Sequence, residues 1–353
     1  MATLAAARTR RAGGLFSPLG FAIVVALVLL LVFTFRGFSY APSSSDGSAG
    51  SSSDSSYNGG SSSGSRSGTS AVPSYGDVPE FGISLSLNLP TWALCPQHPC
   101  KYSAMADGTV NTSVPFNSQF GEDVWLSKNL FFNKVNGFYI EMGAMNGVDL
   151  SNTRWLYQAA GWKGLLIEAC PGMANDLIRN RKDAIAVHAA VCGDFRTVRW
   201  HSAGNVGGIW EFMAEGFKQQ FHRDVKPETL PELPCVPFQF LLDKFGIGGA
   251  DLWSLDVEGA ELEVLKTVDF SRFQAKVIMV ELDGHNKEKD ADVTKLLLAV
   301  GYEVLKKTEQ MSPEMRHFNT IFVHKSAWPH LAQAPGLPQP EIDADPLNVP
   351  PQR

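Results

Sequence analysis

Four acidic side chains stand at the ends of short apolar runs, where they could bind a ligand or take up a proton. They are Glu141, Glu168, Asp256 and Glu281. A carboxylate accepts hydrogen bonds from hydroxyl and ammonium groups, and it can act as a general base. One acid at the end of a strand is usually a solvated turn residue. Four of them in one chain predict that the carboxylates converge along one edge of a sheet.

The first of these acids leads into a glycine-containing turn, residues 141–147, and a helix-start pattern follows at residues 151–153. In an α/β sheet, a strand followed by a tight turn and a helix N-terminus usually holds a nucleotide-like cofactor. A dinucleotide loop needs Gly-x-Gly-x-x-Gly, but Met145 occupies the place of the second glycine, and Glu141 would repel phosphate. No Walker sequence is present either. The turn therefore predicts a cofactor with an ammonium group and ribose hydroxyls but no phosphate, and S-adenosylmethionine has these features.

The predicted cofactor ligands come from this turn, from the helix start and from neighbouring segments. They are Glu141, Gly143, Ala144, Asn146, Gly147, Asn152, Glu168 and Gln119. We expect the amino group of the cofactor near Glu141 and both ribose hydroxyls on Glu168. Glu168 is predicted to be an exposed acid, so its removal should weaken cofactor binding with little loss of stability. Gln119 belongs to a segment that either folds over the cofactor as a lid or packs as a helix on the sheet edge.

Candidate catalytic residues follow two later strands, and they are Asp256, Glu258 and His285. A hydroxyl acceptor must lose its proton, and a positioned base accelerates this step by roughly 10²–10⁴-fold. Two alternatives stay open, because Glu258 could cap the next helix or bind an arginine, and a loop histidine is often merely exposed. Asp256, Asp283 and Asn286 could together hold magnesium, but their spacing is weak support, and no metal is predicted.

The elements that must position these residues alternate between strand-like and helical patterns. Predicted strands cover 137–141, 164–168, 185–191, 197–200, 251–256, 276–281, 302–305 and 320–324. Predicted helices cover 119–132, 152–160, 174–181, 238–245, 261–265 and 290–300. Such alternation indicates an α/β fold with a parallel sheet that is covered on both faces.

Residues 118–323 resemble the FkbM family of S-adenosylmethionine-dependent methyltransferases. The resemblance rests on residues 118–123, 141–147, 151–153, 161–164, 167–168 and 256–261. It implies a Rossmann-like class I methyltransferase sheet of seven strands with the last one antiparallel. It also implies O-methylation, usually of sugar or polyketide hydroxyls. The chain has Glu141 where aspartate is common, and residues 204–235 match poorly, which leaves the recognition of the acceptor open.

The two ends of the chain differ from its middle in composition. Residues 15–35 carry no charge, and as a helix they would span roughly the 30 Å of bilayer hydrocarbon. Arginines precede this run, so residues 1–14 are predicted to be cytosolic and the remainder lumenal. Residues 36–90 are predicted to be a disordered Ser/Gly-rich stalk, 91–326 the methyltransferase domain, and 327–353 an irregular Pro-rich tail. A cleaved signal and a plastid or mitochondrial transit peptide are the alternatives to the anchor.

Charge and cysteine content narrow the class of protein further. The net charge is −6 and no basic block is present, which argues against a nucleic-acid partner. Cys95 and Cys100 could close a small disulfide loop in an oxidising lumen, since further zinc ligands at the usual spacing do not follow. Cys170, Cys192 and Cys235 are predicted to be buried thiols.

Together these features predict a single-pass type II membrane protein of the Golgi or endoplasmic reticulum, with a plastid location as the alternative. Its lumenal domain is expected to methylate a hydroxyl of a glycan or glycoconjugate with S-adenosylmethionine. Trp210 could stack on a sugar ring. A catalytically silent membrane adaptor of the same fold is a rival function. A nicotinamide-dependent sugar oxidoreductase is a second rival, and Met145 argues against it.

Overall fold

The computed structural model describes residues 77–78, 83–84, 86–88, 109–203 and 207–347 of the chain. The predicted cytosolic segment 1–14, the predicted anchor 15–35, and Cys95 and Cys100 lie outside the described residues. Among the residues described, no helix combines the length and the apolar character needed to cross a membrane. Residues Thr69–Arg353 form one compact unit, and it contains every described residue.

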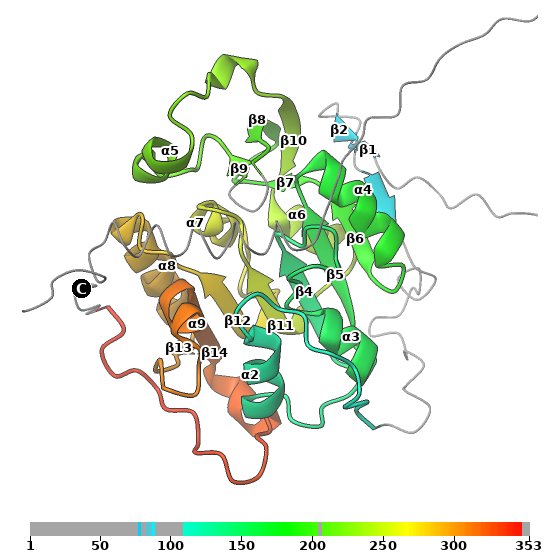
Figure 1. Ribbon diagram of the computed structural model, residues 1–353, viewed down its shortest axis with the longest axis vertical. Helices are drawn as coiled ribbons and strands as arrows, with labels where there is room; N and C mark the ends of the chain where they lie inside the picture. The colour runs from blue at the N-terminus through cyan, green and yellow to red at the C-terminus, as the bar shows by residue number, and fades with distance from the viewer. Residues whose placement is uncertain (1–76, 79–82, 85, 89–108, 204–206, 348–353) are drawn as a thin grey trace, which may run out of the picture. The chain divides into compact units, whose positions relative to one another are not determined.

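A mostly parallel sheet forms the centre of this unit (Figure 1). Its order is β13-β14-β12-β11-β4-β5-β6-β3. The strands are β3 (Ser86–Asn88), β4 (Phe138–Met142), β5 (Lys163–Glu168), β6 (Ile185–His188), β11 (Gly249–Leu255), β12 (Gln274–Glu281), β13 (Tyr302–Val304) and β14 (Asn319–His324). β14, the last in sequence, runs antiparallel to both of its neighbours, as predicted for a class I methyltransferase sheet of seven strands. β3 adds an antiparallel edge strand beside β6, so the sheet includes three residues of the segment predicted to be stalk.

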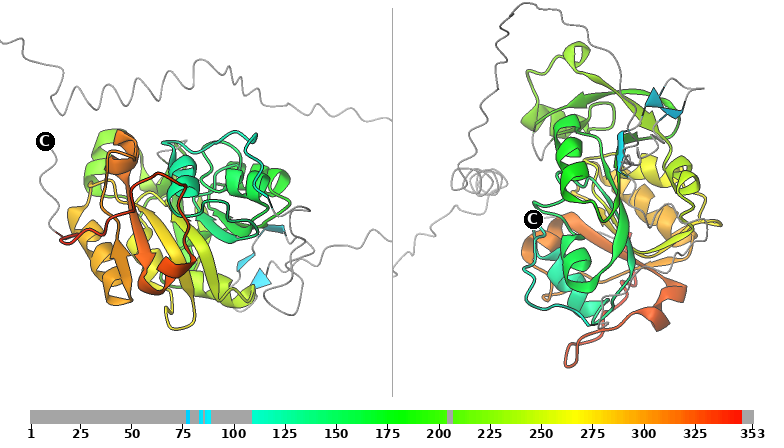
Figure 2. Two further views of the ribbon diagram at one scale, coloured as in Figure 1. Left: turned by 90° about the horizontal axis from the view of Figure 1, so that it is seen from below. Right: turned by 90° about the vertical axis from the view of Figure 1, so that its right-hand side faces the viewer.

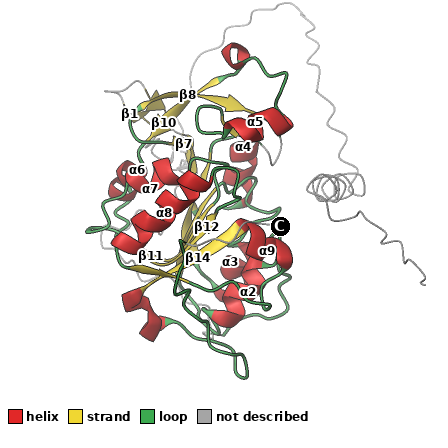
Figure 3. Ribbon diagram, turned by 90° about the vertical axis from the view of Figure 1, so that its left-hand side faces the viewer, coloured by secondary structure: helices red, strands yellow, loops and turns green. Residues whose placement is uncertain are grey.

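Side chains of alternating residues pack against helices on the two faces of the sheet. The face bearing Ile140 and Trp253 is covered by α6 (Phe238–Lys244), α7 (Glu261–Lys266) and α8 (Lys287–Ala299). The face bearing Tyr139 and Leu252 is covered by α2 (Glu122–Asn129), α3 (Arg154–Ala160), α4 (Pro171–Asn180) and α9 (Pro313–Phe318). Figure 3 shows α6, α7 and α8 on one side of the strands and α2, α3 and α9 on the other, and Figure 2 gives two further views. Because both faces are buried, the strands are continuous apolar runs, as the sequence indicates.

The strand order reverses between β4 and β11, which lie side by side at the centre of the sheet. Their carboxyl ends are in register, since Glu141 pairs with Ser254 and Met142 with Leu255. The amide of Asp256 also donates to the carbonyl of Met142 at 3.1 Å. In open α/β sheets the ligand crevice lies outside the carboxyl ends at such a switch point. The predicted cofactor turn therefore lies at this switch point.

The region after β6 differs most from the prediction. The strand expected at 185–191 divides into β6 and β7 (Ala190–Val191), and β7 starts a second sheet with order β7-β10-β8-β9. Its other members are β8 (Arg196–His201), β9 (Gly208–Ile209) and β10 (Glu232–Val236), and α5 (Glu215–Phe221) lies between β9 and β10. We call residues 193–234 the excursion. A Cys192–Cys235 disulfide closes it at its base, so the prediction of buried thiols is wrong for these two cysteines, while Cys170 is a half-buried free thiol.

The Pro-rich tail is packed against the domain. It begins with a short 3₁₀ helix, η4 (Lys325–His330), where an irregular chain was predicted. Beyond it the chain has no helix or strand up to residue 347, but Ala332 exchanges backbone hydrogen bonds with Leu130 and Phe132. Farther along, the amide of Asp343 donates to the carbonyl of Val304 at 2.8 Å. Satisfying these backbone groups holds the tail in place without regular secondary structure.

Candidate active site

Glu141 is the next-to-last residue of β4, and its buried carboxylate organises the start of α3. It accepts hydrogen bonds from Ser151 Oγ at 2.8 Å, the Asn152 amide at 2.7 Å and Thr153 Oγ1 at 2.6 Å. Ser151 Oγ in turn accepts from the amide of Arg154, the first residue of α3, at 3.1 Å, while Thr153 at the N-cap position forms no side-chain cap hydrogen bond. Glu141 therefore fixes the strand end and the helix start relative to each other.

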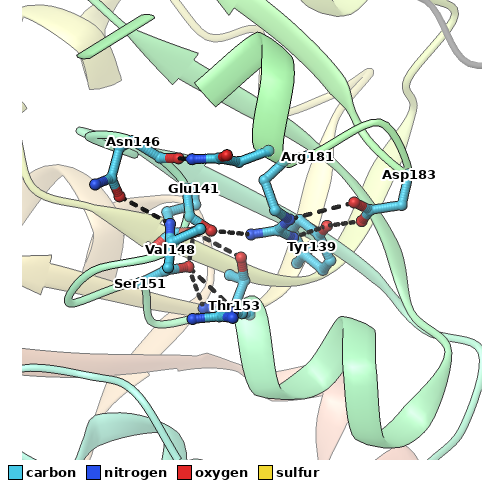
Figure 4. A network of polar contacts seen from close by, with 11 residues as sticks. Tyr139, Glu141, Asn146, Val148, Ser151, Thr153, Arg181 and Asp183 are labelled. Atoms are coloured by element: carbon cyan, nitrogen blue, oxygen red, sulfur yellow. Dashed lines mark hydrogen bonds and ion pairs between the residues drawn. The ribbon is translucent and has the colours of Figure 1, made fainter. Parts of the chain in front are cut away.

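Arg181 is the main positive charge facing Glu141, and sequence reasoning did not single it out. Its side chain is 2 % exposed and donates to the Gly147 carbonyl at 3.2 Å, to the Tyr139 hydroxyl and to Asp183. Figure 4 shows Glu141 between the Ser151–Thr153 segment and Arg181. Burial raises the pKa of Glu141, and the charge of Arg181 partly opposes that rise. Arg181 thus stabilises the turn in two ways. It donates a hydrogen bond to the Gly147 carbonyl, and its positive charge stabilises the charged form of Glu141.

The two glycines of the turn are required by a positive φ and by close neighbours, which are backbone at Gly143 and side chains at Gly147. Gly143 has φ +83°, and a Cβ atom there would lie 1.8 Å from the backbone oxygen of Asp256. Gly147 has φ +73°, and its Cβ would lie 2.5 Å from Arg181 Cγ. Met145, at the position of the missing second glycine, also has a positive φ of 49°. The turn therefore has positive φ at three of its residues, and its middle residue carries a side chain.

The amides of this turn are bonded within the protein. Those of Gly143 and Ala144 donate to the Ile167 carbonyl at 3.0 and 3.1 Å, and that of Met145 donates to Glu168 Oε2 at 2.7 Å. Phosphate-binding loops instead direct their amides at the anion. This arrangement gives a physical reason for a cofactor without phosphate at this turn.

Glu168 is buried at 5 % exposure, which contradicts the prediction of an exposed strand-end acid. Its Oε1 accepts from the Cys170 amide at 2.7 Å, while its Oε2 accepts from Met145. Burial raises its pKa. Each carboxylate oxygen has two lone pairs, so both can still accept a hydroxyl hydrogen bond. Glu168 therefore joins the cofactor turn to the loop after β5 and keeps capacity for ribose hydroxyls.

We now predict that Glu168→Ala lowers both stability and cofactor affinity. The part-buried amides of Met145 and Cys170 would lose their acceptor, and each such loss costs up to about 1–3 kcal/mol. Urea unfolding measures the first effect, and calorimetry with S-adenosylhomocysteine measures the second. Glu263→Ala is the matched control, since Glu263 pairs with Lys266 at the surface. An unchanged unfolding free energy for Glu168→Ala would contradict the role of this carboxylate in joining the two loops.

Three other predicted cofactor ligands occupy different surroundings. Asn152 donates from Nδ2 to Ser254 Oγ at 2.9 Å, while its buried Oδ1 has no hydrogen-bond partner within the described part of the chain. An ammonium group is a donor that fits such an acceptor, so this orphaned oxygen is compatible with S-adenosylmethionine. Asn146 directs Oδ1 to the amides of residues 148 and 149 and so stabilises the turn itself. Gln119 is exposed and precedes α2. α2 packs on the sheet, which agrees with the predicted helix rather than with the predicted lid over the cofactor.

Three carboxylates gather at the ends of β11 and β12. Oxygens of Asp256, Glu258 and Glu281 all lie within 4.8 Å of one another, close enough to hold a metal ion, and Asp283, weighed with Asp256 as a magnesium ligand, is not in this group. Burial raises the pKa of Asp256 to about 7 and raises those of Glu258 and Glu281 well above their usual range, with mutual repulsion adding to the last two. At neutral pH this group therefore holds protons. Glu281 was recognised as a strand-end acid but not as a catalytic candidate.

Glu258 does not cap the next helix, which was one of its predicted alternatives. Glu261 Oε1 instead accepts the amides of Val257 and Gly259 at 3.2 and 3.0 Å. Glu261 Oε2 pairs with Lys289 Nζ at 2.7 Å. Glu258 has φ +54°, so its backbone adopts a left-handed conformation uncommon for this residue type. The turn at the end of β11 is thus held by Glu261, which leaves Glu258 to the carboxylate group.

Asp283 and His285 form a hydrogen-bonded pair after β12. His285 Nδ1 lies 2.7 Å from Asp283 Oδ2, and the His285 amide donates to Asp283 Oδ1 at 2.9 Å. The hydrogen bond with Asp283 raises the pKa of His285 above its ordinary 6.5. With Nδ1 directed at the carboxylate, Nε2 is the nitrogen that can exchange a proton with a ligand. This pair lines one pocket together with Glu258, so the structure brings two of the three predicted catalytic residues to the same pocket.

The other wall of that pocket comes from the excursion, through Phe212, Ala214 and Phe217. None of these was predicted from the sequence. The spacing of Phe217 and Phe221 does indicate a helix with an aromatic face, but it does not say against what that face packs. Lys218 Nζ lies 5.0 Å from the ring centre of Trp210, and the role of Trp210 in stacking on a sugar stays a prediction.

Comparison with known protein families identifies the middle of the chain. Residues 141–304 match the family model described as the methyltransferase FkbM domain. A search of curated proteins found no match. The matched segment runs from Glu141 to the end of β13 and so contains the glycine turn, Glu168, the carboxylate group and the Asp283–His285 pair.

Several solved structures are similar to this chain at low identity. A precorrin-6y C5,15-methyltransferase from Geobacter metallireducens GS-15 is 15% identical, covering 62% of this chain and 95% of its own, with a TM-score of 0.33. A methyltransferase FkbM from Methylobacillus flagellatus KT is 11% identical, covering 57% and 50%, with a TM-score of 0.34. Aeropyrum pernix fibrillarin, solved with natively bound S-adenosyl-L-methionine, is 12% identical, covering 54% and 66%, with a TM-score of 0.29. From the family match and the class I sheet, residues 141–304 are a methyltransferase domain of the FkbM family, and its cofactor is S-adenosylmethionine.

Proposed function

We propose that the protein is an O-methyltransferase that methylates a hydroxyl of a glycan or glycoconjugate. The observation that carries this proposal is the Asp283–His285 pair in a pocket beside Glu258, at the carboxyl ends of β11 and β12. A hydroxyl needs a base near neutral pH, and a histidine oriented by a carboxylate is suited to that task. The reaction class is thus proposed from the site and agrees with what the family resemblance implies.

The cofactor supplies a methyl group that its sulfonium centre already activates for in-line transfer. We assign the two ribose hydroxyls to the remaining lone pairs of Glu168, and the ammonium group to the orphaned Asn152 Oδ1 near Glu141. Glu141 acts indirectly, because it accepts the hydrogen bond of the Asn152 amide and so fixes the position of Asn152. Preorganised acceptors of this kind position the reactants, and positioning accounts for much of the rate in a displacement reaction.

At the acceptor, His285 takes the hydroxyl proton on Nε2, and Asp283 stabilises the imidazolium that forms. Bound S-adenosylmethionine would supply the methyl group and leave as its neutral thioether, and the proton lost by the acceptor hydroxyl would be held on His285 Nε2. The protonated members of the Asp256, Glu258 and Glu281 group serve as hydrogen-bond donors or acceptors to neighbouring hydroxyls. Asp256, with a pKa of about 7, is the second candidate for the base.

We also propose that residues 15–35 anchor the chain as a type II membrane protein, with the methyltransferase domain in the lumen of the Golgi or endoplasmic reticulum. The Cys192–Cys235 disulfide supports an oxidising compartment, because disulfides rarely persist in the cytosol. Alkylation of free thiols in intact cells, followed by non-reducing mass spectrometry, tests this. A fully alkylated Cys192 and Cys235 in the native protein would contradict the proposed location.

Calorimetry of the full chain with S-adenosylhomocysteine tests cofactor binding, and methyl transfer to released glycans tests the reaction. A gain of one methyl group on a glycan hydroxyl, detected by mass spectrometry only with active protein, is the expected product. The full chain is needed, since both β3 and the tail pack on the domain. Methylation on nitrogen alone, with no O-methyl product, would contradict the proposed acceptor.

A further inference from the structure

Three consecutive exposed residues, Asn111, Thr112 and Ser113, form the one Asn-x-Ser/Thr triplet in the sequence. Such a triplet is the acceptor for N-linked glycosylation when its middle residue is not proline. The triplet by itself carries little weight, because it also arises by chance in segments that no transferase modifies. Its meaning depends on where the fold places it.

The triplet lies in a turn at the surface. The Ser113 amide donates to Asn111 Oδ1 at 3.1 Å, and the Val114 amide donates to the Asn111 carbonyl at 3.4 Å. This is an Asx-turn, in which asparagine bonds the backbone two residues farther on. The turn engages the oxygen of the side-chain amide, whereas a glycan is attached at its nitrogen, Nδ2. The conformation of the turn is therefore compatible with a sugar on Asn111.

Contacts with α3 hold this turn in place without covering it. The Asn111 amide donates at 2.7 Å to the carbonyl of Ala159, in the last helical turn, where intrahelical donors run out. Trp155 Nε1 donates to the Val114 carbonyl at 3.1 Å, and the ring of Phe116 stacks on that of Trp155 with centres 4.8 Å apart. Backbone and flanking side chains make these contacts, so a glycan on Asn111 Nδ2 requires no rearrangement of the fold.

The turn is at the opposite edge of the sheet from the cofactor turn. β4 and β5 run parallel, and α3 connects the carboxyl end of the first to the amino end of the second. The cofactor turn precedes Arg154, the first residue of α3, whereas Asn111 bonds to Ala159 near its last. Asn111 thus lies where the strands begin, while the cofactor turn and the carboxylate group lie where they end. A glycan at Asn111 leaves the cofactor turn accessible.

The disulfide is an independent observation that points to the compartment in which N-linked glycans are attached. Cys192 and Cys235 are both buried and bonded to each other, and they lie in a different part of the fold from Asn111. Such bonds form in the oxidising lumen of the endoplasmic reticulum and rarely persist in the cytosol. Lumenal exposure is also what an acceptor asparagine needs, so the disulfide and the exposed triplet agree.

We infer that Asn111 carries an N-linked glycan, and this inference rests on the lumenal location proposed above. The donor is an oligosaccharide linked through a diphosphate to a polyisoprenoid lipid. Asn111 Nδ2 forms a bond to the anomeric carbon of the first sugar, and the bond from that carbon to the diphosphate oxygen breaks. The lipid diphosphate leaves with the electron pair, and one amide proton passes to a base of the transferase. The product is an uncharged glycosyl amide at the surface of the domain.

Translation of the full chain with microsomes, followed by peptide-N-glycosidase digestion and electrophoresis, tests the assignment. The parent should give a slower band that the glycosidase removes, and Asn111→Gln should lose that band. Ser113→Ala should lose it too, because the acceptor triplet needs the hydroxyl, while Ser113→Thr should keep it. Thr112→Ala is the matched control, since it changes an exposed neighbour and leaves the triplet intact. A slower band that persists in Asn111→Gln would overturn the assignment.

Protease protection on the same microsomes separates the glycan from the location on which it rests. If the domain is protected from added protease and the parent gives no slower band, the glycan inference is overturned while the lumenal location stands. If the protease digests the domain in sealed microsomes, both fall. Parent protein with and without its glycan should bind S-adenosylhomocysteine with equal affinity, and a difference would contradict the placement of the glycan away from the cofactor turn.

Discussion

Gly143→Ala is expected to destabilise the protein by about 3–5 kcal/mol and to remove measurable cofactor binding. A Cβ atom at this position would meet the backbone oxygen of Asp256 at 1.8 Å, and φ is +83°, so both space and conformation exclude a side chain. Backbone cannot yield as a flexible side chain can. Relief of the clash would separate β4 from β11 at the switch point, where the amide of Asp256 bonds to Met142.

Urea unfolding and calorimetry with S-adenosylhomocysteine measure the two effects of Gly143→Ala. Gly172→Ala is the matched control, because Gly172 lies in α4 and a Cβ atom there would meet nothing within 4 Å. That variant should gain about 0.5–1 kcal/mol, since alanine loses less entropy in a helix. If Gly143→Ala unfolds at the same urea concentration as the parent, the two strand ends do not approach each other as closely as the structure shows.

His285→Ala is expected to lower kcat by roughly 10²–10⁴-fold, with little change in the affinity for S-adenosylhomocysteine. The side chain stands at the pocket and is bonded to Asp283, so its loss removes the base without touching the cofactor turn. Single-turnover methyl transfer at saturating cofactor measures the effect. His330→Ala, an exposed histidine of η4, is the control and should retain the activity of the parent.

The pH dependence of kcat tells the two candidate bases apart. His285 must be neutral to accept a proton, so the rate falls as pH drops below its pKa, which Asp283 holds above 6.5. Asp290 also raises this pKa and Lys289 lowers it, and neither changes in the test. Asp283→Asn removes the carboxylate that stabilises the imidazolium, so the pKa falls and the acidic limb moves to lower pH. If the acidic limb of the kcat–pH profile of Asp283→Asn lies at the same pH as in the parent, the titrating group is Asp256, and the role of His285 is contradicted.

Much of the site was accessible from the sequence because it depends on local pattern. The strands read as apolar runs ending in acids, and parallel strands bring their carboxyl ends to one edge, which is where Glu141, Glu168 and Asp256 lie. The glycine turn was found because a tight turn restricts residue types. Met145 and Glu141 argued from the sequence against a phosphate ligand. The structure adds an independent reason, because the amides of the turn are already hydrogen-bonded within the protein.

The errors concern contacts between segments distant in sequence. Glu168 was taken for an exposed acid because its burial depends on the turn at Met145, 23 residues earlier in the chain, which approaches it only in the folded state. Cys192 and Cys235 were taken for thiols because nothing local shows that β7 and β10 pair. Arg181 reads as an ordinary basic residue near a helix end, and only the fold buries it beside Tyr139 and Gly147.

The sequence by itself determined the class of sheet, the cofactor turn and the acids that end the strands. These follow from hydrophobic period, glycine conformation and chain direction, which are properties of neighbouring residues. Only the tertiary structure decided which acids share a pocket and that the excursion faces His285. It also decided that Arg181 supports the cofactor turn. The reason is physical, because a side chain's burial, charge environment and partners are set by residues that the chain brings together from far apart.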